Sequence, residues 1–152
     1  MPRSARDRDR LGVRGRGRDD RRRVREQPAR RVIGIGVDLV EVDRMRTALA
    51  RTPSLRLRLF TEGERAYAES AADPSQRFAA RFAAKEAAMK ALGVGLGDID
   101  WHDVEVIRGE SGAPSLRVTG RAQELAADLG VARWQVTLTH TDSMAEAVVV
   151  AL

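Results

Sequence analysis

The chain has 152 residues, contains no cysteine and carries a formal net charge of +5 at neutral pH. This length suits one domain with its own core, and the lack of cysteine excludes disulfides, thiolate metal sites and a cysteine nucleophile. The sequence has neither an apolar run long enough to span a membrane nor a signal-peptide pattern at its start, so we expect a soluble, cytoplasmic protein.

The basic charge is concentrated in residues 1–31, which hold 13 arginines and 5 acidic residues, whereas residues 32–152 have a net charge of −3. The first segment is poor in apolar residues, so it cannot bury enough surface to offset the entropy of ordering. We therefore predict a disordered tail, or a start assigned too far upstream, followed by one domain over 32–152. A nucleic-acid-binding tail is the alternative, but no aromatic residue is interleaved for base stacking.

Residues 32–40 alternate in character, which predicts a β-strand. One face carries four apolar residues that we expect to face the core: Ile33, Ile35, Val37 and Leu39. Gly34, Gly36 and Asp38 share the other face, where two glycines leave room beside the carboxylate for a ligand or another backbone. A strand packed tightly under a helix, with Asp38 at its exposed end, is the alternative.

Three segments are predicted between this strand and residue 72. A helix is expected over 41–50 and is ended by Thr52-Pro53-Ser54. Residues 55–60 read as an apolar connector. The pattern Thr61-Glu62-Gly63-Glu64 is a capping box, which begins a short helix that runs to about residue 72.

The longest helix is predicted over 77–92, because strong helix formers continue without glycine or proline until Gly93. Its apolar arc consists of Phe78, Phe82, Met89 and Leu92. Glu86 lies at the edge of this arc, and Lys90 follows it by four residues. A basic ridge borders the other side of the arc: Arg77, Arg81 and Lys85. These charges beside an apolar seam suggest a functional site, and a solvated surface helix with ordinary ion pairs is the alternative.

The rest of the chain predicts two hairpins separated by a helix: strands 101–107 and 116–118, a helix over 120–129, and strands 134–140 and 145–151. The order of elements does not alternate strictly between strand and helix. It is typical of a small α+β domain in which an antiparallel sheet packs on a long central helix.

Asp38 and Glu86 form the candidate carboxylate pair, because the first strand and the longest helix are expected to pack together. Two hard oxygen ligands without a cysteine suit Mg²⁺, which keeps waters and takes further ligands from substrate phosphates. Arg81, Lys85 and Lys90 could bind those phosphates. A Mg²⁺-dependent nucleotide phosphohydrolase could use the same groups.

The chain has two histidines. His102 lies at the entrance of a predicted strand, where we expect a structural or solvent-facing role. His140 is flanked by Thr139 and Thr141 at the end of a strand, and an imidazole with two hydroxyls suits phosphate or ribose groups. A turn histidine that is satisfied by the backbone is the alternative.

Three blocks, residues 33–41 (IGIGVDLVE), 81–87 (RFAAKEA) and 138–141 (LTHT), resemble the holo-acyl-carrier-protein synthase family of 4′-phosphopantetheinyl transferases. Their order and spacing are similar throughout residues 32–152, and the first 31 residues have no counterpart in the family. The resemblance implies an α+β subunit of the phosphopantetheinyl transferase type. It also implies a homotrimer that has its coenzyme A sites between neighbouring subunits.

The implied reaction transfers 4′-phosphopantetheine from coenzyme A to a serine of apo-acyl carrier protein, and adenosine 3′,5′-bisphosphate leaves. By this resemblance, Asp38 and Glu86 hold Mg²⁺ against the coenzyme A diphosphate, and Glu86 is a candidate acceptor of the serine proton. Lys90 would stabilise the leaving group. The enzyme itself needs no nucleophile, which is consistent with the absence of cysteine.

The resemblance also assigns binding residues. The nucleotide site would be lined by Arg81, Lys85, Thr139 and His140. The acidic carrier protein would dock on Arg44, Arg51 and Arg58. Coenzyme A and acyl carrier protein are therefore the expected partners, and we expect neither a membrane nor a nucleic acid to be one.

Overall fold

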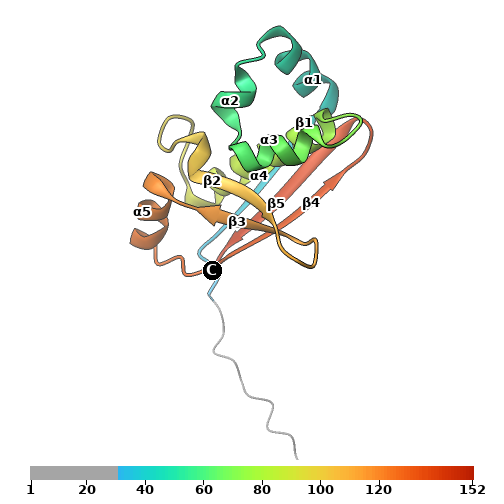
Figure 1. Ribbon diagram of the computed structural model, residues 1–152. Coiled ribbons are helices and arrows are strands. Elements are labelled where there is room, and N and C mark those ends of the chain that lie inside the picture. Colours follow the sequence, from blue (N-terminus) through green and yellow to red (C-terminus); the bar gives the residue numbers. More distant parts are fainter. Residues whose placement is uncertain (1–30) are drawn as a thin grey trace, which may run out of the picture.

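The computed structural model describes residues 31–152 (Figure 1). The predicted disordered tail therefore lies, apart from Arg31, outside the described residues. In chain order the elements are β1 (Gly34–Glu41), α1 (Val42–Arg51), α2 (Leu55–Leu59), α3 (Glu62–Glu69), α4 (Ser75–Leu92), the 3₁₀ turn η1 (Trp101–Asp103), β2 (Val104–Arg108), β3 (Pro114–Val118), α5 (Gly120–Asp128), β4 (Trp134–His140) and β5 (Met144–Ala151). The predicted α+β class is confirmed.

The strands form two antiparallel sheets, one of three strands in the order β1-β5-β4 and one of two strands, β2-β3. Helix α4 packs along β1 and β5, and the arm formed by α1 and α2 extends beyond one end of the larger sheet (Figure 1). Both predicted hairpins are present. No helix within residues 31–152 is long and apolar enough to cross a lipid bilayer.

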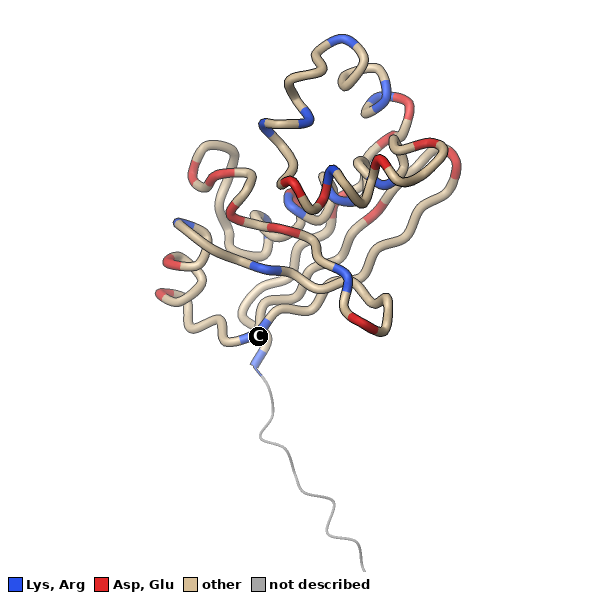
Figure 2. The backbone as a smooth tube through the Cα atoms, viewed as in Figure 1, with Lys and Arg blue, Asp and Glu red and all other residues tan. Residues whose placement is uncertain are grey.

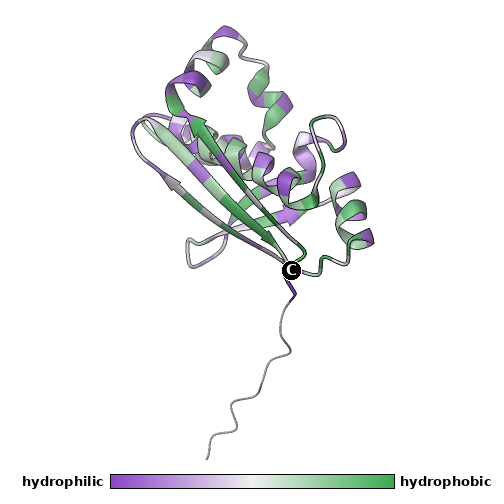
Figure 3. Cartoon of the chain, turned by 180° about the vertical axis from the view of Figure 1, so that it is seen from behind, coloured by the Kyte–Doolittle hydropathy of each residue, from purple (hydrophilic) through white to green (hydrophobic). Residues whose placement is uncertain are grey.

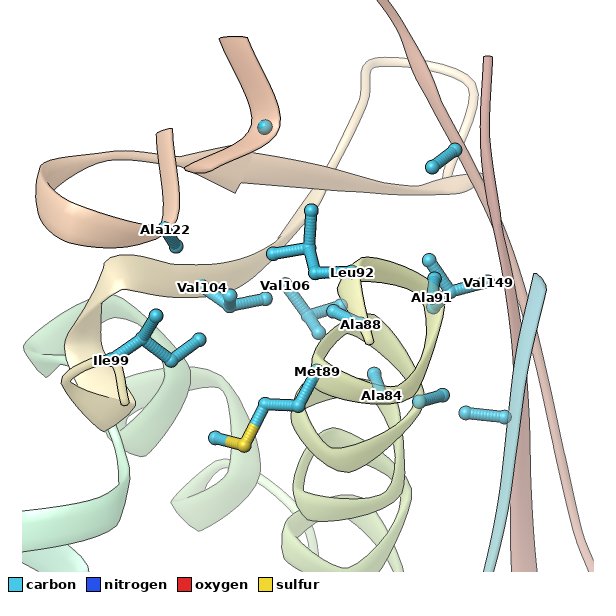
Figure 4. Close-up of a cluster of buried hydrophobic side chains, with 14 of the residues drawn as sticks. Ala84, Ala88, Met89, Ala91, Leu92, Ile99, Val104, Val106, Ala122 and Val149 are labelled. Carbon is cyan, nitrogen blue, oxygen red and sulfur yellow. The ribbon is translucent and has the colours of Figure 1, made fainter. Parts of the chain in front are cut away.

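Helix α4 is the centre of the core (Figure 4). It is buried almost all round, and five of its alanines have no exposed surface: Ala79, Ala83, Ala84, Ala87 and Ala88. These small side chains allow the neighbouring strands to approach the helix closely. The surface-helix alternative is therefore wrong. Two members of the predicted basic ridge, Arg81 and Lys85, are themselves buried.

The predicted orientation of the first strand is also wrong. Ile35, Val37 and Leu39 are 60%, 45% and 57% exposed, and they lie on the outer side of the sheet, where Figure 3 shows hydrophobic colouring along the strand that leads into α1. The glycine face packs against α4 instead. This close packing requires glycine, because a Cβ atom on Gly36 would lie 1.8 Å from the carbonyl oxygen of Ala87.

Two segments differ from prediction for local reasons. Residues 55–59 form a short helix, as leucine and arginine are good helix formers despite their strand-like alternation. Residues 101–103 form a 3₁₀ turn, because Asp100 accepts a hydrogen bond from the backbone N–H of His102 in a capping box with Asp103. The strand therefore begins at Val104.

Candidate active site

A hollow of about 660 Å³ lies where β1, α1, α2 and α4 meet, and we call it the carboxylate pocket. Asp38, Glu86 and Arg44 are among its polar lining residues. Its apolar wall consists of Leu39, Val40, Met45, Ala48, Leu55, Leu59, Phe82 and Met144. The predicted carboxylate pair thus faces one pocket, and an apolar surface that the sequence did not indicate lies beside it.

The close packing of β1 on α4 brings the two carboxylates to the same pocket. Gly34 and Gly36 have no room for side chains, because a Cβ atom on either would lie within 2 Å of a carbonyl oxygen of α4. Asp38 follows Gly36 by two residues and so lies on the same strand face. That face is turned toward the helix that carries Glu86 and Lys90.

Lys90 joins the helix to the strand. Its Nζ lies 2.9 Å from Oδ1 of Asp38 and also donates a hydrogen bond of 2.9 Å to the carbonyl oxygen of Val37. The Asp38 side chain is mostly buried, at 16% exposed, whereas that of Lys90 is 52% exposed. The structure therefore brings together the three predicted catalytic residues.

The environment of Glu86 disfavours its charged form. Burial raises the pKa of the Glu86 carboxyl above its ordinary value, and the nearby charge of Asp38 raises it further, while Lys90 acts in the opposite direction. A cation held between the two carboxylates would relieve both effects. The electrostatics of the pocket thus favour a bound cation.

The pair fits a magnesium ion better than a metal held by protein ligands alone. Within residues 31–152, no cluster of three or more histidine, cysteine or acidic side chains could hold a metal ion. Two carboxylates leave coordination positions free for water and for phosphate oxygens, which is how proteins usually bind Mg²⁺. The donor set therefore suits an ion that is shared with a phosphorylated ligand.

We expect Glu86→Gln to be more stable than the wild type at neutral pH in metal-free buffer. The pKa of Glu86 in the folded state is raised above its ordinary value of 4.5. Between the unfolded-state pKa and the folded-state pKa, the folded state binds more protons than the unfolded state, so the wild type loses stability as the pH rises through this range. Thermal unfolding at several pH values tests this. The stability difference should vanish well below the ordinary pKa, and a less stable variant at neutral pH would contradict the account.

A second hollow of about 500 Å³, the basic pocket, lies between α3, α4, the β2-β3 turn and β4. Its lining includes one aromatic ring, four basic side chains and one carboxylate, which is paired with Arg46: Tyr67, Arg77, Arg81, Arg108, His140 and Asp73. The guanidinium carbons of Arg81, Arg77 and Arg108 lie 4.0, 4.4 and 5.4 Å from the centre of the Tyr67 ring. Three arginines around one aromatic ring suit an anionic ligand.

Arg81 is the buried member of this pocket. Burial lowers the pKa of its guanidinium, which nevertheless stays charged in proteins. Its Nε is buried and has no hydrogen-bond partner among the described residues. The predicted residues Arg81 and His140 are thus brought together. The pocket's other residues were not predicted as site residues. Only Arg77 could have been found from the sequence, because it precedes Arg81 by one helical turn.

Lys85 does not line either pocket, which argues against its predicted role in nucleotide binding. Its ammonium group is fully buried, forms an ion pair of 2.9 Å with Glu64 and donates hydrogen bonds to the carbonyl oxygens of Trp101 and Val104. Burial lowers the pKa of Lys85, and the charge of Glu64 opposes that shift. Glu64 in turn accepts a hydrogen bond of 2.8 Å from the backbone N–H of Val106. The pair therefore ties α3 and β2 to the middle of α4.

Thr139 and His140 lie on opposite faces of β4. Thr139 pairs with Glu146 and His140 pairs with Ala145, whose side chain is buried on the α4 side of the sheet. Thr139 consequently faces outward and does not line the basic pocket of its own subunit. The alternation of side chains along a strand separates the two neighbours. His102 has a structural contact, since its Nε2 lies 2.9 Å from the carbonyl oxygen of Leu57.

The three predicted docking arginines are exposed on the α1-α2 arm, where Figure 2 shows several blue segments. Arg44 lines the carboxylate pocket and, together with Arg51, a neighbouring groove of about 410 Å³ along α1. Arg58 lies on α2 and lines neither of these hollows. The arm therefore carries positive charge directly beside the two carboxylates.

Comparison with known proteins gives a consistent result. The sequence model of the 4′-phosphopantetheinyl transferase superfamily matches residues 34–148. A holo-[acyl-carrier-protein] synthase of Frankia casuarinae is 51% identical over 120 residues, which cover 79% of this chain and 97% of that protein.

Solved structures show the same likeness. The Helicobacter pylori holo-[acyl-carrier-protein] synthase in complex with coenzyme A has a TM-score of 0.69 and 27% identity, covering 78% of this chain and 99% of that chain. The Bacillus anthracis holo-(acyl-carrier-protein) synthase in complex with CoA (3′,5′-ADP) has a TM-score of 0.66 and 30% identity, covering 79% and 96%. The family match over residues 34–148 and the likeness to these structures therefore agree.

Proposed function

Because this chain belongs to the 4′-phosphopantetheinyl transferase superfamily, we propose that it transfers 4′-phosphopantetheine from coenzyme A to a serine of apo-acyl carrier protein. The products are holo-acyl carrier protein, which serves fatty-acid synthesis in the cytoplasm, and adenosine 3′,5′-bisphosphate. The observation that carries the proposal is that Asp38 and Glu86 line one pocket and that Lys90 is paired with Asp38. The comparisons favour this reaction over a nucleotide phosphohydrolase, which the same carboxylates would also allow. The nucleic-acid-binding alternative relies on residues outside the described part of the chain.

The chemistry follows from the charges of the carboxylate pocket. Asp38 and Glu86 would hold Mg²⁺, which when bound neutralises the coenzyme A diphosphate. Glu86, directly or through a water, is the candidate acceptor of the proton that leaves the attacking serine. The ammonium of Lys90, already beside Asp38, would stabilise the negative charge on the departing bisphosphate. The remaining rate enhancement comes from holding serine and phosphorus in line.

The basic pocket would bind phosphate groups of the nucleotide. Arg81 and His140 keep the role that the sequence predicted, and Arg77 and Arg108 join them as further cations at the same pocket. The unpaired Nε of Arg81 leaves one donor free for a phosphate oxygen.

We infer that the enzyme is a homotrimer with its sites between neighbouring subunits. The outer side of the larger sheet exposes Ile35, Val37 and Leu39, and a contiguous apolar face of this kind is typical of an interface. Leu39 also lines the carboxylate pocket, at the β1 edge of this sheet, and the basic pocket adjoins its β4 edge. Head-to-tail contact across such a face would bring the basic pocket of one subunit toward the carboxylate pocket of the next.

We expect Val37→Asp to convert the trimer into folded monomers. Val37 lies in the middle of β1, faces away from the core and pairs with Val148 of β5, so a charge there would be buried only in the assembly. Sedimentation velocity measures the change. Leu57→Asp, which alters an exposed leucine of α2 outside the sheet, is the matched control and should remain trimeric. A monomeric wild type, or a trimeric Val37→Asp variant, would contradict the assembly.

Arg44→Glu is expected to raise KM for acyl carrier protein about tenfold or more while KM for coenzyme A changes little. Arg44 is exposed at the rim of the carboxylate pocket, where an acidic partner would gain from its charge and be repelled by a carboxylate. Steady-state kinetics with each substrate varied in turn gives both constants. The docking surface lies elsewhere if both constants stay at their wild-type values.

A further inference from the structure

The cation that pairs with Asp38 in this structure is the ammonium group of Lys90. Its Nζ lies 2.9 Å from Oδ1 of Asp38 and 2.9 Å from the carbonyl oxygen of Val37. The side chain is half exposed, so a flexible four-carbon chain carries its ammonium group to this position. Nothing else in the described chain forms an ion pair with Asp38.

The local charges do not balance without a further cation. The carboxylate pocket is lined by three carboxylates, Asp38, Glu41 and Glu86, and by one cation, Arg44. Lys90, which is paired with Asp38, adds a second positive charge and leaves one negative charge in excess. Glu86 forms no ion pair within residues 31–152, and its pKa is raised partly by the charge of Asp38. A divalent ion between the carboxylates would overcompensate, because Lys90 would then lie beside an ion of the same sign. An anionic diphosphate would restore the balance.

We propose that the ammonium group of Lys90 substitutes for the divalent ion. It pairs with Asp38 while coenzyme A is absent, and it moves to the diphosphate when the ion and coenzyme A bind. This inference rests on the proposed function, since it takes Asp38 and Glu86 as the ligands of the ion. It adds a consequence that the proposed function does not contain. The ion and coenzyme A bind cooperatively, and the release of Lys90 from Asp38 adds to the coupling that the direct contact between ion and diphosphate supplies. By thermodynamic linkage, each ligand raises the affinity for the other by the same factor.

The test uses Mn²⁺ as the probe and measures its dissociation constant by electron paramagnetic resonance, with and without coenzyme A and without carrier protein, so that no transfer occurs. In the wild type, coenzyme A should tighten Mn²⁺ binding by about tenfold or more. Lys90→Met should bind Mn²⁺ about tenfold more tightly than the wild type when coenzyme A is absent, and coenzyme A should tighten its Mn²⁺ binding by a smaller factor than in the wild type. Lys90 is half exposed, so this variant should fold normally.

Two further variants separate the possible outcomes. Arg44→Met removes a positive charge from the same pocket, but Arg44 forms no bond to Asp38, so Mn²⁺ affinity should stay within about twofold of the wild type. Asp38→Asn should lose Mn²⁺ binding. If Asp38→Asn does so while Lys90→Met binds Mn²⁺ no more tightly than the wild type, the substitution of Lys90 for the ion is overturned and the metal site stands. If Asp38→Asn binds Mn²⁺ normally, the proposed metal site itself fails, and the inference fails with it.

Discussion

Replacing Asp38 with asparagine, or Glu86 with glutamine, is expected to lower kcat/KM for apo-acyl carrier protein by about 10²- to 10³-fold at saturating Mg²⁺. Each change removes one of the two carboxylates that we assign to the ion, and within residues 31–152 no group of three or more acidic, histidine or cysteine side chains is placed to hold a metal ion instead. Neither side chain belongs to the buried core, so both variants should remain folded. Steady-state kinetics together with thermal unfolding separates loss of function from loss of structure.

Glu124→Gln provides the matched control for this prediction. Glu124 lies on α5, is exposed and pairs with the equally exposed Arg121, so its loss should change turnover by less than about twofold. Wild-type turnover by either pocket variant would reject the assignment of Asp38 and Glu86 to the ion.

Lys85→Met is expected to lower the free energy of unfolding by about 3–5 kcal/mol. The substitution leaves Glu64 charged and unpaired where neither side chain has exposed surface. It also removes the donor to the carbonyl oxygens of Trp101 and Val104. Urea unfolding measures the loss, and poor yield of folded protein would be its extreme form.

The comparison for Lys85 is Arg121→Met, which breaks the exposed ion pair with Glu124 and should cost less than about 1 kcal/mol. Glu64→Gln is a gentler second variant, because its amide oxygen can still accept from the backbone N–H of Val106. A Lys85→Met variant as stable as Arg121→Met would contradict the structural role of Lys85 and would again allow its predicted role in nucleotide binding.

The residues that carry the proposed chemistry could be predicted because their signals are local. Asp38 shares a strand face with two glycines, and a helix can approach such a face, while Glu86 and Lys90 are spaced by one helical turn. The packing of the first strand on the longest helix then places both carboxylates at one pocket and Lys90 beside Asp38. The order of strands and helices was predictable for the same reason, since turn residues and periodicity mark each element.

The orientation of β1 could not be predicted from its alternation alone. An alternating strand has one apolar face, and the usual expectation is that this face is buried. Here α4 is lined with alanines and needs the glycine face for backbone contact, so the apolar face that contains Val37 points outward. Which face of β1 packs against the core is decided by the side chains of the partner helix and, as we propose, by contact with a neighbouring subunit.

The structure places Lys85 and Thr139 away from the two pockets, for different physical reasons. A helical projection cannot show that Lys85 has a buried partner, because Glu64 lies on a different helix. The separation of Thr139 from His140 was implicit in the sequence, since neighbouring residues of a strand face opposite sides. The basic pocket needed the tertiary structure, as Tyr67, Arg81 and Arg108 come from three separate elements.

The most direct test of the account is the intact mass of apo-acyl carrier protein after incubation with this enzyme, coenzyme A and Mg²⁺. The account predicts that the carrier protein gains the mass of one phosphopantetheine group, that chelation of the divalent ion prevents the gain, and that Asp38→Asn largely abolishes it. An unmodified carrier protein, or full modification after the ion has been removed, would contradict the claim that Asp38 and Glu86 hold an ion against the coenzyme A diphosphate.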